Sequence, residues 1–168
     1  MKKYIRTALL AALLLAVCGI ALAGEAALDR FDFATTDLDG NAVSSADIYA
    51  GNRITMVNFW ATWCPPCVRE LGELTEIHSQ LQQMSCGVIG ILIDDDLEEA
   101  HALMAKNGTN YPVLLLSKDM NGLARTVTAI PTTYFVDATG AVVGEPIIGA
   151  YVDRYVPAVE TLLGEQAG

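Results

Sequence analysis

The sequence predicts an α/β fold in which helices cover both faces of a mixed β-sheet. Apolar runs with the composition of strands alternate with helical segments through the middle of the chain, as in sheets whose parallel strands are joined by crossover helices. A pair of short strands separated by a turn follows near the C-terminus, which adds antiparallel strands to the sheet. With 168 residues, the chain has room for one domain and a short appendage.

Composition and periodicity predict the elements in order. A small N-terminal β-hairpin is expected from the alternating segment Phe31-Asp32-Phe33, the turn Asp39-Gly40-Asn41 and the apolar residues Ala42 and Val43. Apolar segments then predict strands at residues 54–60, 88–93, 113–116, 133–136 and 142–148. Helices are expected at residues 67–84, 97–106, 121–126 and 153–163, the second of them ending at the stop signal Asn107-Gly108.

The expected helix at residues 67–84 is amphipathic. With Cys67 at 0° and an advance of about 100° per residue, one narrow stripe holds Leu71, Leu74, Ile77 and Leu81. Glu70 lies inside this stripe, whereas Glu73 and Glu76 lie outside it. Because apolar surroundings raise the pKa of a carboxyl group, Glu70 is a candidate functional acid one helical turn from Cys67. A glutamate whose carboxylate extends to solvent is the alternative.

Charge and composition exclude several classes of protein. Ten basic and twenty acidic residues give a net charge of −10, which argues against a nucleic-acid partner. An apolar content of 52% excludes a disordered tail. Four cysteines are too few for a small domain held together by disulfides.

Residues 1–23 have the pattern of a secretory signal peptide. A basic start precedes an apolar run over residues 8–23, which ends in the small-x-small pattern Ala21-Leu22-Ala23. We therefore expect an exported domain over residues 24–168, in the periplasm or another extracytoplasmic space. An uncleaved membrane anchor and lipid attachment at Cys18 are the alternatives.

The expected mature domain is more acidic than the whole chain. Residues 1–23 hold three of the ten basic residues and none of the twenty acidic ones, so their removal gives a net charge of −13. Such a charge favours encounters with basic partners. The mature domain keeps Cys64, Cys67 and Cys86, which is one pair and one further thiol in an oxidising compartment.

The motif Trp63-Cys64-Pro65-Pro66-Cys67 lies between a buried strand and the amphipathic helix. Proline is tolerated in the first helical turn, so Cys64 is placed at the helix N-terminus. Unpaired N–H groups and the helix dipole favour an anion there, and they lower the pKa of a thiol. Cys67 follows one turn later, within reach of Cys64. The spacing predicts a nucleophilic thiol and a resolving thiol.

Three other uses of the pair fit the sequence less well. A zinc site needs four ligands, and only His78 or His101 could complete one. Covalent haem attachment needs a histidine directly after the second cysteine, where Val68 stands. A purely structural disulfide leaves the Pro-Pro spacer at the helix start without a purpose.

The segment Val57–Cys67, VNFWATWCPPC, resembles the active-site segment of thioredoxin-like proteins. It is most similar to the exported TlpA/ResA-like branch, which includes the DsbE/CcmG proteins. The segment Ile130–Asp137 resembles the cis-proline segment of the same family and its following strand. The resemblance extends over residues 31–163. It implies the thioredoxin fold and dithiol–disulfide exchange that needs no cofactor and no metal.

The resemblance also implies roles for single residues. Cys64 would attack a disulfide of the partner, and Cys67 would resolve the mixed disulfide. Pro131 would be cis and face the cysteine pair, although by itself it would be read as a trans proline that opens a strand. The residues expected to contact the partner are Trp63, Pro65, Pro66, Ile130 and Pro131.

Asn58 departs from the pattern of ordinary thioredoxins, which have a buried acid six positions before the first cysteine. An asparagine cannot accept a proton at neutral pH. In the TlpA/ResA-like branch, a glutamate three residues after the second cysteine takes over acid–base work. Glu70 matches that position.

Other reactive residues are expected to serve the fold. His78 lies about 16 Å along the helix from Cys67, which is too far for proton transfer, so a partly buried structural histidine is expected. His101 is expected to be solvated. The run Asp94-Asp95-Asp96 is expected to cap the next helix, because three consecutive residues converge poorly on a metal. Cys86 is expected to be an inert small apolar residue, with an intermolecular disulfide as the alternative.

The sequence therefore predicts an exported thiol–disulfide oxidoreductase that reduces partner proteins. The resemblance points to haem-attachment sites of apocytochrome c as substrates and to a membrane thiol transporter as electron donor. Three alternatives remain open. They are a thiol oxidant or isomerase, a peroxiredoxin-like peroxidase, whose N-terminal pattern resembles residues 31–47, and a Cu(I) carrier that uses the thiolates of the pair.

Overall fold

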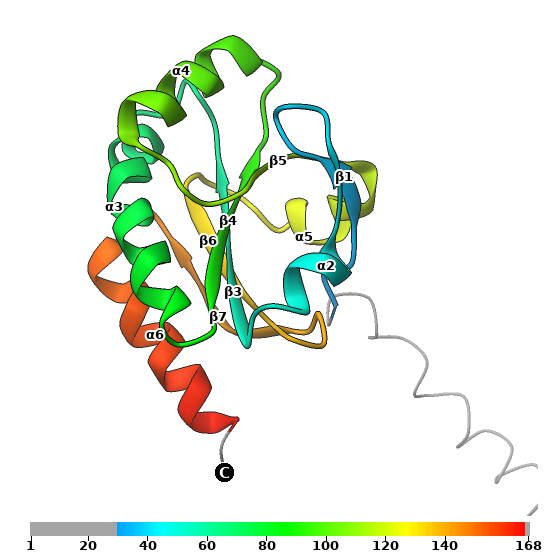
Figure 1. Ribbon diagram of the computed structural model, residues 1–168, viewed down its shortest axis with the longest axis vertical. Coiled ribbons are helices and arrows are strands. Elements are labelled where there is room, and N and C mark those ends of the chain that lie inside the picture. Colours follow the sequence, from blue (N-terminus) through cyan, green and yellow to red (C-terminus); the bar gives the residue numbers. More distant parts are fainter. Residues whose placement is uncertain (1–29, 167–168) are drawn as a thin grey trace, which may run out of the picture.

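The structure is a computed structural model that describes residues 30–166 (Figure 1). The expected signal peptide and Cys18 lie outside these residues. The strands are β1 (Ala34–Thr36), β2 (Ala42–Ser44), β3 (Ile54–Trp60), β4 (Gly87–Leu92), β5 (Val113–Leu115), β6 (Thr132–Asp137) and β7 (Val142–Ile148). The helices are α2 (Ser45–Tyr49), α3 (Pro65–Gln82), α4 (Leu97–Asn107), the 3-10 turn η1 (Lys118–Met120), α5 (Asn121–Ala124) and α6 (Val152–Glu165).

Five strands form the central sheet in the order β5-β4-β3-β6-β7. β3 runs parallel to β4, and β4 parallel to β5, because α3 and α4 return the chain to the same edge. β6 and β7 are antiparallel and joined by the turn at residues 138–141. The expected mixed sheet is confirmed. β3 lies at its centre and is buried along its whole length, which explains its uninterrupted apolar run.

Helices and loops cover both faces of the sheet, and each face has its own core (Figure 1). α3, α4 and α6 cover one face, whose core includes the fully buried side chains of Trp60, Leu71, Leu74, Leu81, Phe135 and Tyr155. α2, α5 and the N-terminal hairpin cover the other, whose core contains Phe31, Phe33, Phe59, Ile89, Ile91 and Tyr134. The first core lies directly beneath the start of α3, so it surrounds the residues that follow the cysteine motif.

The N-terminal hairpin is present, but its first strand begins later than expected. β1 starts at Ala34 and pairs with β2, while Phe31 and Phe33 precede it and lie buried in the second core. Their alternation therefore reflects burial of two rings and not pairing with β2, since the N–H of Phe31 donates to the carbonyl of Gly140 beside β7. α2 was not predicted, because five residues are too few for a periodic apolar pattern. Its one local signal is Ser44, whose hydroxyl accepts the N–H of Asp47 as an N-cap.

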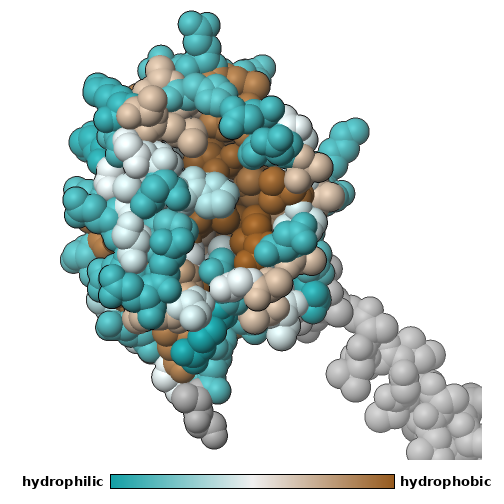
Figure 2. Space-filling model, in the orientation of Figure 1, coloured by the Kyte–Doolittle hydropathy of each residue, from teal (hydrophilic) through white to brown (hydrophobic). Residues whose placement is uncertain are grey.

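The 3-10 turn η1 was not predicted either. The other elements lie where they were expected, and most differences are confined to one or two residues at their ends. α4 ends at Asn107 and is followed by Gly108, whose φ of 64° is the left-handed conformation that the Asn107-Gly108 signal predicts. The surface in Figure 2 is mostly hydrophilic, with apolar side chains gathered in one hollow area. Within residues 30–166, none of the helices combines the length and the hydrophobicity needed to cross a bilayer.

Candidate functional site

Cys64 and Cys67 form a disulfide at the junction of β3 and α3. Cys64 is the N-cap of α3, with Pro65 and Pro66 at the first two helical positions. The backbone N–H of Cys67 donates to Cys64 Sγ over 3.3 Å. An N–H group at a helix N-terminus therefore already points at the sulfur that would carry the negative charge in the reduced protein.

The surroundings of the two sulfurs differ. Cys67 is fully buried and Cys64 is 3% exposed, whereas the neighbouring Trp63 is 67% exposed. Cys64 thus lies at the edge of the core next to the exposed Trp63, and Cys67 is the more deeply buried of the pair. A partner molecule that reaches the pair from the solvent meets Trp63 and Cys64 first.

The expected cis-proline segment lies beside the pair. The Ile130–Pro131 peptide bond is cis. The carbonyl oxygen of Ile130 is 3.7 Å from Cys64 Sγ, although the two residues are 66 positions apart. The carbonyl of Pro131 accepts the N–H of Gly149 over 2.7 Å, which ties the segment to the end of β7. The structure therefore brings together the two motifs that the sequence analysis singled out.

Glu70 is 2% exposed and lies on the buried face of α3, as the helical periodicity predicts. Its Oε1 accepts the Nδ2 amide of Asn58, and its Oε2 accepts the hydroxyl of Tyr155, each over 2.9 Å. Burial raises the pKa of Glu70 to about 7, against the lowering effect of both hydrogen bonds. The carboxyl group can therefore gain or lose a proton near neutral pH.

Asn58 connects Glu70 to the centre of the sheet. Its Nδ2 also donates to Thr133 Oγ1 over 3.0 Å, so both amide hydrogens have acceptors. Asn58 and Thr133 face each other across β3 and β6. The position that holds an acid in ordinary thioredoxins is thus occupied here by a donor that orients Glu70.

Tyr155 and Thr133 are the members of this network that sequence reasoning missed. Tyr155 is fully buried on α6, and its hydroxyl is also 3.4 Å from the carbonyl of Gly149. It lies 85 residues from Glu70 in the chain. The only sequence signal was a tyrosine on the apolar face of an amphipathic helix, which is equally typical of an ordinary core residue.

We expect Tyr155→Phe to raise the pKa of Glu70 above about 7, because the substitution removes a donor that stabilises the carboxylate. The loss of this hydrogen bond should lower the free energy of unfolding by about 1 kcal/mol. The pKa is measured by NMR titration of the labelled glutamate carboxyl carbon.

Tyr134→Phe is the matched control, because the Tyr134 hydroxyl bonds to Thr126 and its ring belongs to the other core. An unchanged Glu70 titration in Tyr155→Phe, or an equal shift in Tyr134→Phe, would contradict the assignment.

The other reactive side chains serve the fold, as expected. His78 is 7% exposed, and its Nδ1 accepts the N–H of Val88 over 3.0 Å. The His101 side chain is 47% exposed. Cys86 is buried, which raises the pKa of its thiol and keeps it inert near neutral pH.

Two of the three consecutive aspartates at residues 94–96 accept hydrogen bonds that stabilise the fold. Asp96 caps α4 by accepting the N–H of Glu99 over 3.0 Å, which confirms the expected cap. Asp94 Oδ2 accepts the N–H and the hydroxyl of Thr62, two residues before Cys64, over 2.6 and 3.2 Å. This second role was not predicted. The part of the chain that the structure describes contains no group of three His, Cys, Asp or Glu residues arranged to hold a metal ion.

The sequence is similar to a known family and to proteins of known name. A sequence model of the AhpC/TSA family matches residues 24–144. The chain is 28% identical over 111 residues to the thiol-disulfide oxidoreductase ResA of Geobacillus kaustophilus, covering 66% of this chain and 63% of that protein. It is 35% identical over 113 residues to the thiol:disulfide interchange protein DsbE of Allochromatium vinosum, covering 66% of this chain and 60% of that protein. The chain thus spans less than two thirds of the length of these relatives.

The fold of this chain is similar to the folds of solved thioredoxin-family structures. A thioredoxin-family thiol:disulfide interchange protein from Chlorobium tepidum superposes with a TM-score of 0.62 at 30% identity, covering 76% of this chain and 89% of the other. The expected thioredoxin fold and the expected similarity to ResA- and DsbE-type proteins are confirmed.

Proposed function

The chain belongs to the AhpC/TSA family, and we propose that it is a thiol–disulfide oxidoreductase that acts on disulfides of other proteins. One observation carries the proposal: the bonded pair Cys64–Cys67 at the N-terminus of α3, with a backbone N–H aimed at Cys64 Sγ. The names of the relatives support it.

In the first step, the thiolate of Cys64 attacks one sulfur of a partner disulfide. A bond forms between Cys64 Sγ and that sulfur, and the other partner sulfur leaves as a thiolate that takes up a proton. The N-terminal N–H groups of α3 stabilise the attacking thiolate. We expect Trp63, Pro65, Pro66, Ile130 and Pro131 to contact the partner chain, and the carbonyl oxygen of Ile130 lies 3.7 Å from Cys64 Sγ.

In the second step, Cys67 attacks Cys64 Sγ and releases the second partner sulfur as a thiolate. The pair is then a disulfide, and the partner has gained two electrons and two protons. Cys67 must lose its proton to attack, and no solvent reaches it in the described structure. Glu70, one helical turn away with a pKa of about 7, is the acceptor that we assign to this proton.

The direction of exchange is proposed from the resemblance. We place the chain outside the cytoplasm, exported by residues 1–23, as a reductant of partner proteins with apocytochrome c among its substrates. Each turnover leaves the pair oxidised, so a dithiol donor must return two electrons. A membrane thiol transporter would be that donor.

Trapping tests the proposal. Reduced Cys67→Ser protein should hold its partner as a mixed disulfide through Cys64, because the resolving thiol is absent. Mass spectrometry then identifies both the partner and the bonded cysteine. The Cys64→Ser/Cys67→Ser double variant, which keeps Cys86, is the control and should trap nothing. Mixed disulfides through Cys86, or faster consumption of hydrogen peroxide than of protein disulfides, would overturn the proposal.

A further inference from the structure

Exposed apolar side chains gather at the edge of the sheet that carries the cysteine pair. Within residues 30–166, the large apolar side chains that are exposed are Trp63, Leu97, Leu116, Ile148 and Tyr151. Trp63 adjoins Cys64, and Ile148 and Tyr151 flank Gly149, which is bonded to Pro131. Leu97 and Leu116 lie at the same edge, Leu97 at the start of α4 and Leu116 directly after β5.

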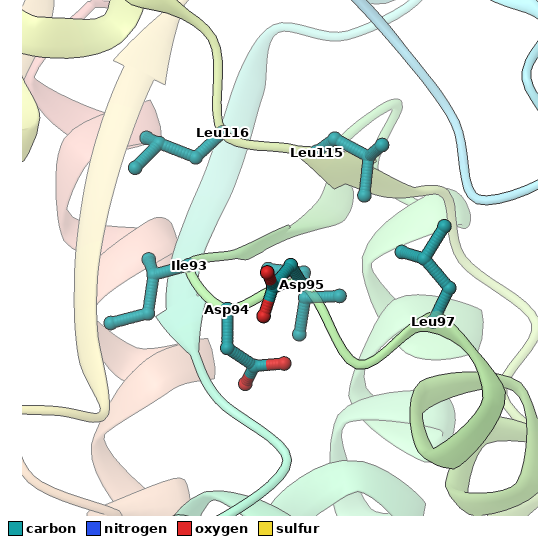
Figure 3. Close-up of a pocket in the computed structure, with 7 residues that line it drawn as sticks. Ile93, Asp94, Asp95, Leu97, Leu115 and Leu116 are labelled. Carbon is teal, nitrogen blue, oxygen red and sulfur yellow. The ribbon is translucent and has the colours of Figure 1, made fainter.

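Leu97 and Leu116 line a surface pocket of about 460 Å³ (Figure 3). The pocket lies where β4 and β5 end and α4 begins. Its lining residues are Leu92, Ile93, Asp94, Asp95, Leu97, Leu115 and Leu116. In Figure 3, the two aspartates lie on the connection from β4 to α4, opposite Leu115 and Leu116. The pocket is therefore an apolar hollow with carboxylates on one side.

Of the three consecutive aspartates at residues 94–96, Asp95 is the one whose side chain makes no hydrogen bond to residues 30–166. Asp94 holds Thr62, and Asp96 caps α4. The carboxylate of Asp95 has no hydrogen-bond partner among residues 30–166, although its backbone carbonyl accepts the N–H of Leu97. A negative charge with no structural task thus borders the apolar hollow.

The pocket is connected directly to the cysteine loop. The N–H of Ile93 donates to the carbonyl of Trp60 over 3.0 Å, and Asp94 holds Thr62. β3, β4 and β5 are parallel, so their ends and the loops that follow them lie at one edge. A chain bound at Cys64 could therefore extend across this edge into the pocket.

We propose that the pocket binds a side chain of the partner protein near the disulfide that Cys64 attacks: an aliphatic or aromatic side chain enters the hollow, and a neighbouring lysine or arginine pairs with Asp95. This inference rests on the proposed function. Charge complementarity selects the basic residue, since the domain after residue 23 carries a net charge of −13. The apolar lining of the pocket favours the aliphatic or aromatic side chain.

Matched cyclic peptides with an internal disulfide test this inference. Each peptide carries leucine or serine at one position and arginine or glutamine at the next. In successive peptides, these two positions are placed further from the disulfide, on its N-terminal or its C-terminal side. The second-order rate constant for their reduction is measured with the reduced protein. At the favoured spacing, leucine should exceed serine by about tenfold, from burial of one side chain. Arginine should exceed glutamine by about threefold at low salt and by less at high salt.

Two variants separate the contributions. Leu97→Ser should abolish the preference for leucine, and Asp95→Asn should abolish the preference for arginine. Glu160→Gln is the matched control, because Glu160 is exposed on α6 and its substitution removes the same charge. It should keep both preferences. Equal rates for all peptides at every spacing, or the same loss in Glu160→Gln as in Asp95→Asn, would overturn the inference.

Glutathione disulfide separates a failure of the pocket from a failure of the cysteine pair. Each half of it is γ-glutamyl-cysteinyl-glycine, which has no aliphatic or aromatic side chain and no lysine or arginine, so all three variants should reduce it at the rate of the unsubstituted protein. Reduction of glutathione disulfide without any peptide preference would overturn the pocket inference alone. Failure of the unsubstituted protein to reduce any disulfide would overturn the proposed function.

Discussion

Cys64→Ser should lower the rate of disulfide exchange by several orders of magnitude, because the thiolate is the nucleophile and a serine hydroxyl stays protonated near neutral pH. The fold should be retained, since the two side chains have similar size and a serine is a favourable N-cap at the start of α3. The rate is measured by following reduction of a protein disulfide by the prereduced variant.

Two controls accompany this variant. Cys86→Ser should leave the rate unchanged, because Cys86 is buried away from the motif. In the unsubstituted reduced protein, Cys64 should be alkylated faster than Cys67 or Cys86, because of the three thiols it alone is the N-cap of a helix. Equal alkylation of the three thiols, or exchange retained in Cys64→Ser, would contradict the assignment of Cys64 as the nucleophile.

Strong local patterns made most of the fold predictable. The run ITMVNFW is buried on both sides as the central strand β3, and the apolar stripe of α3 packs against the sheet. α2 has too few residues for such a pattern. The prediction that Phe31 and Phe33 lie in a strand was wrong, since two inward-facing rings in an irregular segment have the same spacing as a strand. These failures occur where tertiary packing, and not periodicity, decides the conformation.

The candidate site was predictable where its residues are close in sequence. Helical periodicity placed Glu70 on the buried face of α3, one turn from Cys67, and a motif placed the cysteines at the helix start. Tyr155 was not predictable, because its contact with Glu70 depends on how α6 packs against α3. Asn58 could be identified from the sequence only because it stands where ordinary thioredoxins have a buried acid. Its role as a donor to Glu70 and Thr133 required the register between β3 and β6.

Glu70→Gln should slow the second step of exchange and raise the free energy of unfolding by an amount that grows between pH 4.5 and about pH 7. The slower step is expected because glutamine cannot take the proton of Cys67. The fold should tolerate the change. The carbonyl oxygen of the introduced amide can accept the Nδ2 amide of Asn58, and its NH₂ group can donate to the hydroxyl oxygen of Tyr155, which then donates to Gly149.

The gain in stability follows from the pKa of Glu70. The carboxyl group keeps its proton up to about pH 7 in the folded protein but loses it near pH 4.5 in the unfolded chain. Between these values the folded state binds more protons, so the free energy of unfolding falls as the pH rises. Glutamine removes this fall. The difference between the variant and the unsubstituted protein should therefore grow from pH 4.5 to pH 7 and stay constant above, at up to about 3 kcal/mol.

Denaturant unfolding across this pH range measures the stability, and the release of partner thiol from a preformed mixed disulfide at Cys64 measures the second step. Glu73→Gln is the matched control, because Glu73 lies outside the apolar stripe of α3 and removal of its charge only weakens a minor repulsion with Glu70. It should leave the release rate nearly unchanged.

A more stable Glu70→Gln protein with slow release would mean that a buried charge is kept at a cost in stability because the reaction needs it. Release at an unchanged rate between about pH 5 and pH 9 would show that Cys67 loses its proton by another route.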